Sequence, residues 1–362
     1  MKRPALVLFL FACALLPYTV FSQKHITVKG FCRIDSLENI VKTQSEDSNK
    51  VSTLNRLSVK QEMLGNYDSS LMYAESAQAL AEKIGFERGL ANALVNIGLD
   101  YIYQSSYQKA LEYQYKAYTI FQNIGNKKGI ANALNNIAGI YFSLGNYSKV
   151  LEYDFRVLTI AQEVGDKIMI ATVFCNIGII YGEQGNQSKA LDYMFKSLGI
   201  AIEINNKNTI ATDLGNIGYT YLNKGDYNKA LEYDFKAVTQ AQKVGDKASN
   251  SNFLGDIGTI YYRQGNYAQA LEYDAKAATI GREIGNIDGV ASIYSNAGEV
   301  YTKLKNYKRA KVFLDSALAL SKKTGNKKNI ETIYGSLAEL DKAIGDYKNA
   351  YDDYEKHVDY HI

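Results

Sequence analysis

The sequence has few prolines, histidines and cysteines, and it has no tryptophan. Its 362 residues include 2 prolines, 3 histidines and 3 cysteines. Both prolines, Pro4 and Pro17, stand close to the start, so nothing later in the chain breaks a helix at a proline. So few histidines and cysteines leave little material for a metal site or a histidine-based active site. These absences favour a chain that is helical for most of its length.

A large excess of either charge is also absent. The chain has 41 basic and 38 acidic residues, and Lys2 and Arg3 account for most of the formal net charge of +3. Binding to nucleic acid needs clustered positive charge. We therefore expect no nucleic-acid partner.

An apolar stretch near the start follows these two basic residues. It covers residues 5–16, and the small residue Ser22 stands just before the polar chain begins. A basic start, a short apolar run and a small residue at the boundary are typical of a secretory signal peptide. The run is shorter than the roughly 20 residues that span a bilayer. We predict a signal peptide over residues 1–22, an exported protein (periplasmic or extracellular) and no stable membrane insertion after its removal. Retention of the segment as an anchor stays an alternative.

The rest of the chain repeats itself every 40 residues. The phrase Ala-Leu-Glu-Tyr begins at Ala110, Ala230 and Ala270, and Asn-Ile-Gly begins at Asn96, Asn176 and Asn216. Eight repeats fit, starting near residues 51, 91, 131, 171, 211, 251, 291 and 331. Residues 23–50 then form an N-terminal cap, as expected at the end of a repeat array.

Each repeat is predicted to form two helices. Leu94, Ile97 and Tyr101 follow the spacing i, i+3, i+7, which predicts a first helix, helix A, over about 91–104. A similar apolar pattern in the next repeat predicts a second helix, helix B, over about 147–163.

Glycines mark the turns and one close contact. Gly-Asn or Gly-Asp pairs, such as the one at Gly145, end helix A and can cap helix B, and a second glycine, such as Gly165, ends helix B. A small residue also recurs in the middle of helix A, as at Gly98 and Gly218. Glycine costs helix propensity there, so its recurrence predicts that helix B packs close to helix A.

The repeat resembles the tetratricopeptide repeat. The residues that fall in the signature positions of that family are Ile97, Gly98, Tyr101, Ala110 and Ala117. The resemblance covers about 49–362 and implies an all-α, right-handed superhelical solenoid of about eight helix-turn-helix units over 51–362. The repeat is longer than the family's usual 34 residues, like the longer-helix subtype of adaptor and sensor arrays. Three aspartates replace a commoner aromatic: Asp154, Asp234 and Asp274.

Enzyme motifs are absent from the sequence. It contains no phosphate-binding loop, no G-x-S-x-G and no H-E-x-x-H. An acidic residue recurs in each repeat, but a base follows it four residues later, as in Glu112–Lys116 and Glu152–Arg156, which predicts a charge-paired, solvated helix face. His357, close to the end, is expected to be solvated. We predict no enzyme activity, no catalytic residue, no metal site and no cofactor.

One array of polar residues supports a binding function. An Asn or Asp stands two residues before the small residue of helix A, and a second polar residue stands four residues earlier on the same helix face. We call the following residues the asparagine face: Asn92, Asn96, Asn132, Asn136, Asn176, Asn216, Asn252, Asp256 and Asn296. In the family that the chain resembles, helix A lines a concave groove, where such asparagines can hydrogen-bond the backbone of an extended peptide. An amide both donates and accepts, which suits a peptide unit. The alternative is that each asparagine bonds a neighbouring loop or helix and holds the stack together.

Together these features predict an exported, non-catalytic tetratricopeptide scaffold that binds a protein or an extended peptide in its groove. Residues that vary between repeats would add side-chain selectivity: Phe142, Glu183, Tyr219, Tyr262 and Arg263. The main alternative is a sensory or regulatory component of a signalling system whose kinase or DNA-binding effector is a separate chain.

Overall fold

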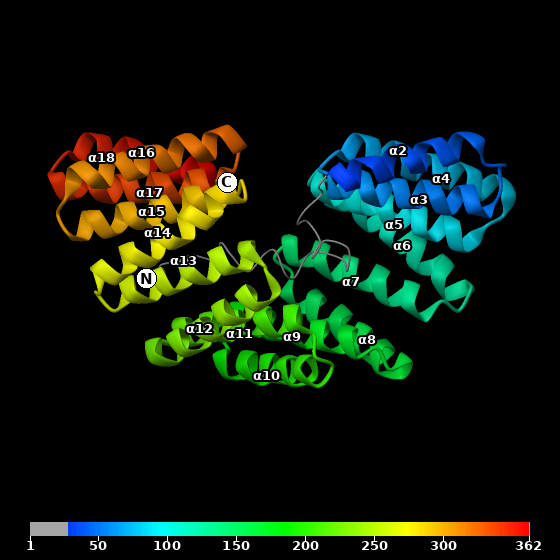
Figure 1. Cartoon of the computed structure of the whole chain (residues 1–362), viewed down its shortest axis with the longest axis horizontal. Coiled ribbons are helices and arrows are strands. Elements are labelled where there is room, and N and C mark those ends of the chain that lie inside the picture. Colours follow the sequence, from blue (N-terminus) through cyan, green and yellow to red (C-terminus); the bar gives the residue numbers. More distant parts are fainter. Residues whose placement is uncertain (1–27, 362) are drawn as a thin grey trace. The chain divides into compact units, whose positions relative to one another are not determined.

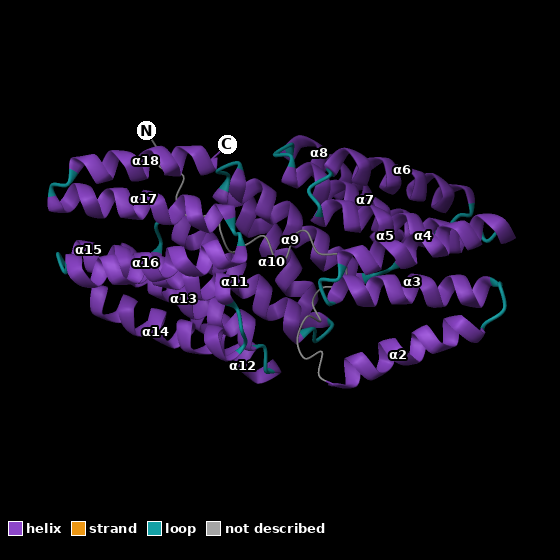
Figure 2. Cartoon of the chain, turned by 90° about the horizontal axis from the view of Figure 1, so that it is seen from above, coloured by secondary structure: helices purple, strands orange, loops and turns teal. Residues whose placement is uncertain are grey.

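The computed structural model describes residues 28–361 of the chain. These residues form 17 helices, numbered α2 to α18, and include no strand (Figure 2). The predicted signal peptide, residues 1–22, lies outside the described residues. Two compact units divide the chain: an N-terminal half, Met1–Gln184, and a C-terminal half, Gly185–Ile362.

Helices of similar length fill both halves. The N-terminal half holds α2 (Val28–Thr43), α3 (Ser48–Met63), α4 (Tyr67–Ile84), α5 (Glu87–Tyr103), α6 (Tyr107–Asn123), α7 (Lys127–Ser143), α8 (Tyr147–Val164) and α9 (Lys167–Glu183). The C-terminal half holds α10 (Gln187–Glu203), α11 (Lys207–Lys224), α12 (Tyr227–Val244), α13 (Lys247–Arg263), α14 (Tyr267–Glu283), α15 (Ile287–Lys303), α16 (Tyr307–Thr324), α17 (Lys327–Ile344) and α18 (Tyr347–His361).

Consecutive helices pack side by side within each half, as Figure 1 shows. The odd-numbered helices from α3 onward are the predicted A helices, and the even-numbered helices from α4 onward are the B helices. This packing of successive helix pairs confirms the all-α solenoid. The helix α2 precedes the first repeat, and its Ile34 and Leu37 pack with Leu57 of α3.

The turns after α3 each place one residue in the left-handed backbone region. That residue is glycine in most turns, as at Gly145 (φ 69°) and Gly165 (φ 68°), which confirms that glycines end the helices. Three turns use Ser105, Asn205 and Lys305 instead, with φ between 53° and 58°. A side chain in this region is strained, because its Cβ crowds the backbone.

Side-chain caps start most of the helices. The predicted caps Asn146 and Asp226 accept hydrogen bonds from backbone N–H groups of helix B, whereas Asn66 instead donates to Gln61. Caps also precede the A helices, as where Asn126 accepts from the N–H of Gly129. As a consequence α7 begins at Lys127, four residues before the predicted start.

Helices A and B approach closely at the predicted small residue. A Cβ atom at Gly98 would lie 2.6 Å from Nε2 of Gln114, and one at Gly218 would overlap the carboxylate of Asp234. A Cβ at Gly298 would lie 2.6 Å from Cγ of Leu314. The close contact predicted from the recurring glycine is therefore confirmed.

An aromatic pair joins helix A to helix B beside this contact. Its stacked rings have centroid separations of 5.4–5.7 Å in Tyr101–Tyr113, Tyr141–Tyr153, Tyr221–Tyr233, Tyr261–Tyr273 and Tyr301–Phe313. The predicted charge pairs lie on the exposed face of helix B, where Nζ of Lys116 is 2.7 Å from Oε1 of Glu112. Arg156 instead donates to the hydroxyl of Tyr118 at 2.7 Å. The outer face is thus charged and largely solvated.

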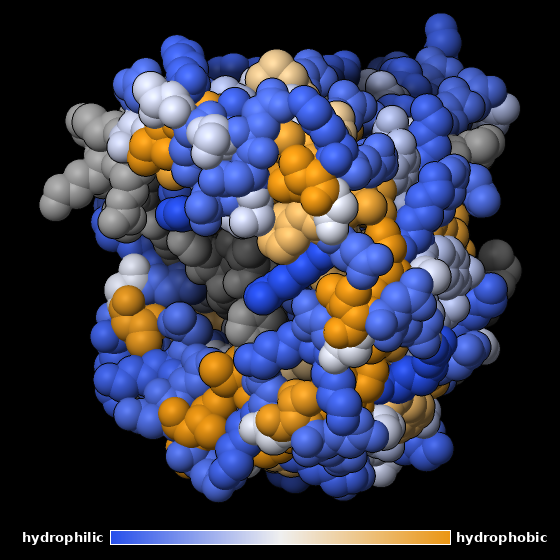
Figure 3. All heavy atoms as spheres, turned by 90° about the vertical axis from the view of Figure 1, so that its right-hand side faces the viewer, coloured by the Kyte–Doolittle hydropathy of each residue, from blue (hydrophilic) through white to orange (hydrophobic). Residues whose placement is uncertain are grey.

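The surface in Figure 3 carries small hydrophobic patches among hydrophilic residues. Between residues 28 and 361, none of the helices combines the length and the apolar character that crossing a membrane requires.

Candidate functional site

All members of the asparagine face lie on A helices. Asn92 and Asn96 are on α5, Asn132 and Asn136 on α7, Asn176 on α9, Asn216 on α11, Asn252 and Asp256 on α13, and Asn296 on α15. Within the N-terminal half α5 contacts α7, and within the C-terminal half α13 contacts α15. The A helices α5 and α7, and likewise α13 and α15, therefore lie against each other and carry their members of the asparagine face side by side.

Exposure separates the asparagine face into two rows. The outer residues Asn92 and Asn132 are exposed, and Asn252 is half-buried. The inner residues, one helical turn later, are largely covered: Asn96 is 7%, Asn136 5%, Asn176 8% and Asn216 4% exposed, whereas Asp256 and Asn296 are half-buried. In the N-terminal half the outer amides are therefore the ones that a ligand can reach from solvent.

Asn96 is engaged by the preceding A helix. Its Nδ2 donates to the backbone oxygen of Asn55 at 3.3 Å and to Oδ1 of Asn55 at 3.2 Å. In return, Nδ2 of Asn55 donates to the backbone oxygen of Gly89 at 3.1 Å. These bonds tie α3 to α5, which is what the stack-holding alternative requires of this asparagine.

Asn136 belongs to a similar network around the neighbouring B helix. Its Nδ2 donates to Oε1 of Gln114 on α6 at 3.3 Å. Nε2 of Gln114 donates to the backbone oxygen of Val95 on α5 at 3.0 Å. A hydrogen-bonded chain thus crosses three helices, and because its members are buried it has a high cost of disruption.

The C-terminal half contains links of the same kind that the repeat pattern did not indicate. Asn329 on α17 donates to the backbone oxygen of Asp288 at 3.2 Å, and its Oδ1 accepts from Ser292 at 3.2 Å. The Ser336 hydroxyl donates to Glu299 at 2.8 Å. Asn55 and Asn329 were missed because neither occupies the positions that recur from repeat to repeat.

Asp256 is the one acid in the asparagine face, and although the residue as a whole is half-buried, desolvation of its carboxyl group raises its pKa to about 7. Asp234 of α12 is buried, and burial together with the charge of Asp256 holds the pKa of Asp234 well above its usual range. A protonated Asp256 can donate a hydrogen bond, whereas an ionised Asp256 can only accept one.

The residues expected to vary the groove differ in accessibility. Phe142 is buried and packs against Tyr147, with ring centroids 5.8 Å apart, so the prediction that it varies the binding surface is wrong. Arg263 is exposed, and Tyr219, Tyr262 and Glu183 are half-buried. These four residues remain available to contact a ligand.

The described residues contain no group of three or more His, Cys, Asp or Glu side chains that could hold a metal ion. His357 is half-buried rather than fully solvated as predicted, and its Nδ1 lies 2.8 Å from the backbone oxygen of Glu331. Cys175 is a buried free cysteine. What the face offers is therefore hydrogen bonding and packing.

Tetratricopeptide repeat models match residues 51–123, 89–163, 129–203, 209–283 and 290–324. The chain belongs to the tetratricopeptide repeat family. No curated protein matches the whole-chain sequence. Members of this family are built from the helix pairs seen in both halves, and the match confirms the resemblance drawn from the repeat.

Several solved structures share the fold at low sequence identity. The apo form of the quorum sensor NprR from B. thuringiensis has a TM-score of 0.69 and 16% identity, covering 95% of this chain and 97% of that one. A Rap protein complexed with Competence and Sporulation Factor has a TM-score of 0.66 and 14% identity, covering 92% and 98%. A signal transduction ATPase with a tetratricopeptide repeat sensor from Pyrococcus horikoshii has a TM-score of 0.58 and 19% identity, covering 88% of this chain and 53% of that one.

Proposed function

We propose that this tetratricopeptide array is an exported, non-catalytic scaffold that binds a protein or an extended peptide along its A helices. The observation that carries the proposal is the exposure of Asn92 and Asn132 at the same position of two neighbouring A helices, α5 and α7. Packed helices lie about 8–10 Å apart and an extended chain advances about 3.3–3.6 Å per residue. The two amides therefore suit backbone groups about three residues apart in a bound peptide.

The inner and outer asparagines have different roles, and this difference supports a binding site at Asn92 and Asn132. The inner amides of Asn96 and Asn136 hold neighbouring helices, which fixes the A helices that carry the outer amides. A rigid platform lowers the entropy that binding must overcome. The Rap protein with a similar fold is complexed with Competence and Sporulation Factor, which makes a peptide or protein ligand a reasonable expectation for this chain.

Export is the part of the proposal that rests on residues 1–22. If they are removed, 39 basic and 38 acidic residues remain, so a near-neutral scaffold without a nucleic-acid partner is expected outside the cytoplasm. Mass spectrometry of the protein from its producing cell should find an N-terminus near Gln23. An intact Met1 on protein from the cytoplasmic fraction would contradict export.

The binding proposal is tested by capturing a ligand with the mature protein and titrating it against two double variants. Asn92→Ala with Asn132→Ala should weaken binding by about 1–3 kcal/mol, since each lost hydrogen bond contributes about 0.5–1.5 kcal/mol. This variant should keep the thermal midpoint of the wild type, because both side chains are exposed.

The matched variant is Asn96→Ala with Asn136→Ala. It removes amides that bond Asn55 and Gln114, so it should lower the thermal midpoint. Calorimetry and thermal melts of both variants separate the two roles. Unchanged affinity in the first variant with an intact fold would remove the outer amides from the binding site.

A second candidate function is a sensory or regulatory component that acts on a separate effector chain. Two proteins of similar fold favour it: a quorum sensor and a signal transduction ATPase with a tetratricopeptide repeat sensor. Capture of a kinase or a DNA-binding regulator by the mature protein would favour this function over a passive scaffold.

A further inference from the structure

The last repeat lacks the aromatic pair that joins helices A and B in earlier repeats. In the preceding repeat Tyr301 of α15 stacks on Phe313 of α16, with ring centroids 5.4 Å apart. Forty residues later the same two positions hold Asp341 of α17 and Asp353 of α18. Two large rings are thus replaced by two short acidic side chains.

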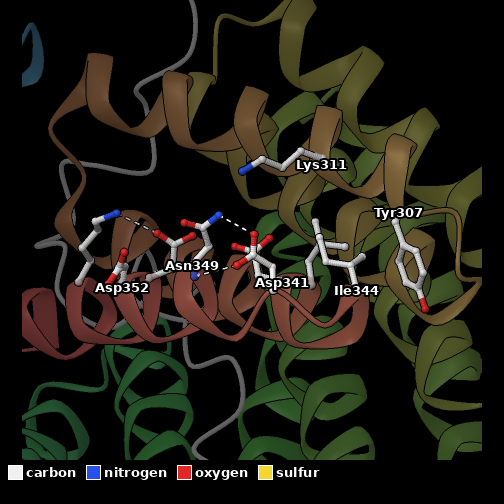
Figure 4. Close-up of a pocket in the computed structure, with 10 residues that line it drawn as sticks. Tyr307, Lys311, Asp341, Ile344, Asn349 and Asp352 are labelled. Carbon is white, nitrogen blue, oxygen red and sulfur yellow. Dashed lines mark hydrogen bonds and ion pairs between the residues drawn. The ribbon is translucent and has the colours of Figure 1, made fainter.

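A cavity of about 430 Å³ lies between α16, α17 and α18 at this place. Its walls combine carboxylates with apolar surface, including the Tyr307 ring and the Ile344 side chain (Figure 4). This volume falls within the range of small-ligand pockets, about 300–1,000 Å³. The cavity is therefore large enough for one amino-acid side chain or a small molecule.

Most charges around the cavity are already paired. Nζ of Lys356 lies 2.9 Å from Asp353, and Nζ of Lys311 lies 3.1 Å from Asp315. Asp346 caps α18 and accepts from the backbone N–H of Asn349 at 3.2 Å and from its Nδ2 at 2.8 Å. These contacts account for both lysines of the cavity wall.

Asp341 is the exception. Asp341 is only 6% exposed and lines the cavity (Figure 4). Within the described part of the chain its side chain makes no hydrogen bond or ion pair. Burial raises its pKa, and the nearby Asp353 adds to this while Lys311 opposes it. An unpaired carboxylate in the wall of a cavity attracts a cation, and pairing with one would offset the cost of its partial desolvation.

We propose that this cavity binds the lysine or arginine side chain of a partner polypeptide. The ammonium or guanidinium group would lie against Asp341, and its aliphatic stem would lie along Ile344 and Tyr307. A metal ion is disfavoured because the described residues hold no group of three ligands for one. The cavity is separate from the asparagine face and belongs to the C-terminal half alone.

The test uses the full chain and two acetylated, amidated tripeptides, Gly-Lys-Gly and Gly-norleucine-Gly, which differ mainly in the charge of the central side chain. Isothermal titration should detect the lysine peptide and not the norleucine peptide. Asp341→Asn should weaken lysine-peptide binding at least tenfold. Asp192→Asn, which removes an exposed acid paired with Lys196, should leave it within twofold of wild type.

A second variant tests whether a loss of lysine-peptide binding could come from misfolding of the protein. Asp341→Tyr with Asp353→Tyr restores the aromatic pair of the earlier repeats, so it should fill the cavity, keep the helical circular dichroism and abolish lysine-peptide binding. Equal losses in Asp341→Asn and Asp192→Asn would overturn the proposal, since they would indicate general surface attraction. Binding of spermidine without binding of the lysine peptide or its arginine counterpart would overturn the polypeptide assignment. The Asn92 and Asn132 variant should bind the lysine peptide normally, so failure here is distinct from failure of the proposed function.

Discussion

Asp154 shows how one residue can set the response of the fold to pH. It is 1% exposed in the contact between helices A and B, and neither carboxylate oxygen finds a hydrogen-bond partner among the described residues. Burial raises its pKa to about 8, whereas an unfolded chain has an aspartate pKa of about 3.9. The folded state therefore holds a proton that the unfolded state releases between these values. Stability from this group is complete below about pH 4 and is lost as the pH rises through about 8.

Asp154→Asn should remove this part of the pH dependence, because an amide does not ionise. The wild type should lose up to about 1.4 kcal/mol more than the variant for each unit of pH between 5 and 8. Urea denaturation at several pH values in this range measures the difference. Equal slopes for the two proteins would show that Asp154 is ionised or hydrated in the folded state. Asp192→Asn is the control, since Asp192 is exposed beside Lys196.

Lys305 is a residue whose replacement should stabilise the fold. It has a φ of 58° in a turn where most repeats have glycine. Lys305→Gly should relieve a strain of about 1 kcal/mol and raise the thermal midpoint. Lys308→Gly, within α16, should instead lower stability by up to about 1 kcal/mol through helix propensity. Differential scanning calorimetry of both variants would test this, and a lower midpoint for Lys305→Gly would show that the lysine makes a compensating contact.

For single residues, the sequence predicted the position in the fold better than the interactions that the side chain makes. The repeat pattern located Asn96 and Asn136 correctly on A helices, but it could not name Asn55 and Gln114 as their partners. Those partners lie on other helices. Their hydrogen bonds depend on the position of α5 and α7 along the axes of the helices that they pack against, which the repeat pattern does not specify. Asn329 has no counterpart in the repeat pattern, so only the folded chain reveals its contacts.

At the scale of helices the sequence predicts more, because local chemistry decides most of the outcome. The apolar stripe and the turn glycines place both helices of each repeat. The A helices nevertheless begin earlier than the stripe, since caps such as Asn126 and Asp166 add a polar first turn. Those caps follow glycines just as the caps of the B helices do, so the signal was present in the sequence.

The contact between helices A and B should tolerate no added side chain at Gly218. Even a Cβ atom there would overlap the carboxylate of Asp234. Gly218→Leu should therefore destabilise the fold by about 1–3 kcal/mol through overpacking, in spite of the better helix propensity of leucine. Gly199→Leu is a matched control, because no atom lies within 4 Å of a Cβ at that position of α10. Urea denaturation should show a loss for the first variant only, and similar midpoints would mean that α11 and α12 separate easily.

On the scale of the whole molecule the 40-residue period is the strongest information in the sequence. It predicts the sixteen helices from α3 to α18 and the succession of A and B helices, because each repeat packs mainly on its neighbours. The acidic cavity of the last repeat was not predicted, although Asp341 and Asp353 can be read in the sequence. A neighbouring side chain could have filled the space that the missing rings leave, and only the packed structure shows that none does.

The same modularity predicts how the chain responds to deletion. Removing residues 211–250 joins Ile210 to Ser251, so the start of α11 continues as α13 and the alternation of helices is preserved. Removing residues 211–230 joins Ile210 to Leu231, so the start of an A helix continues as a B helix and the apolar faces no longer match. In a repeat array the free energy of unfolding is close to a sum of repeat and nearest-neighbour terms. The protein with the first deletion should therefore lose about one repeat's contribution to this free energy and still unfold cooperatively. The second should lose far more. Far-ultraviolet circular dichroism and thermal melts would compare the two, and equal damage from both deletions would contradict the modular solenoid.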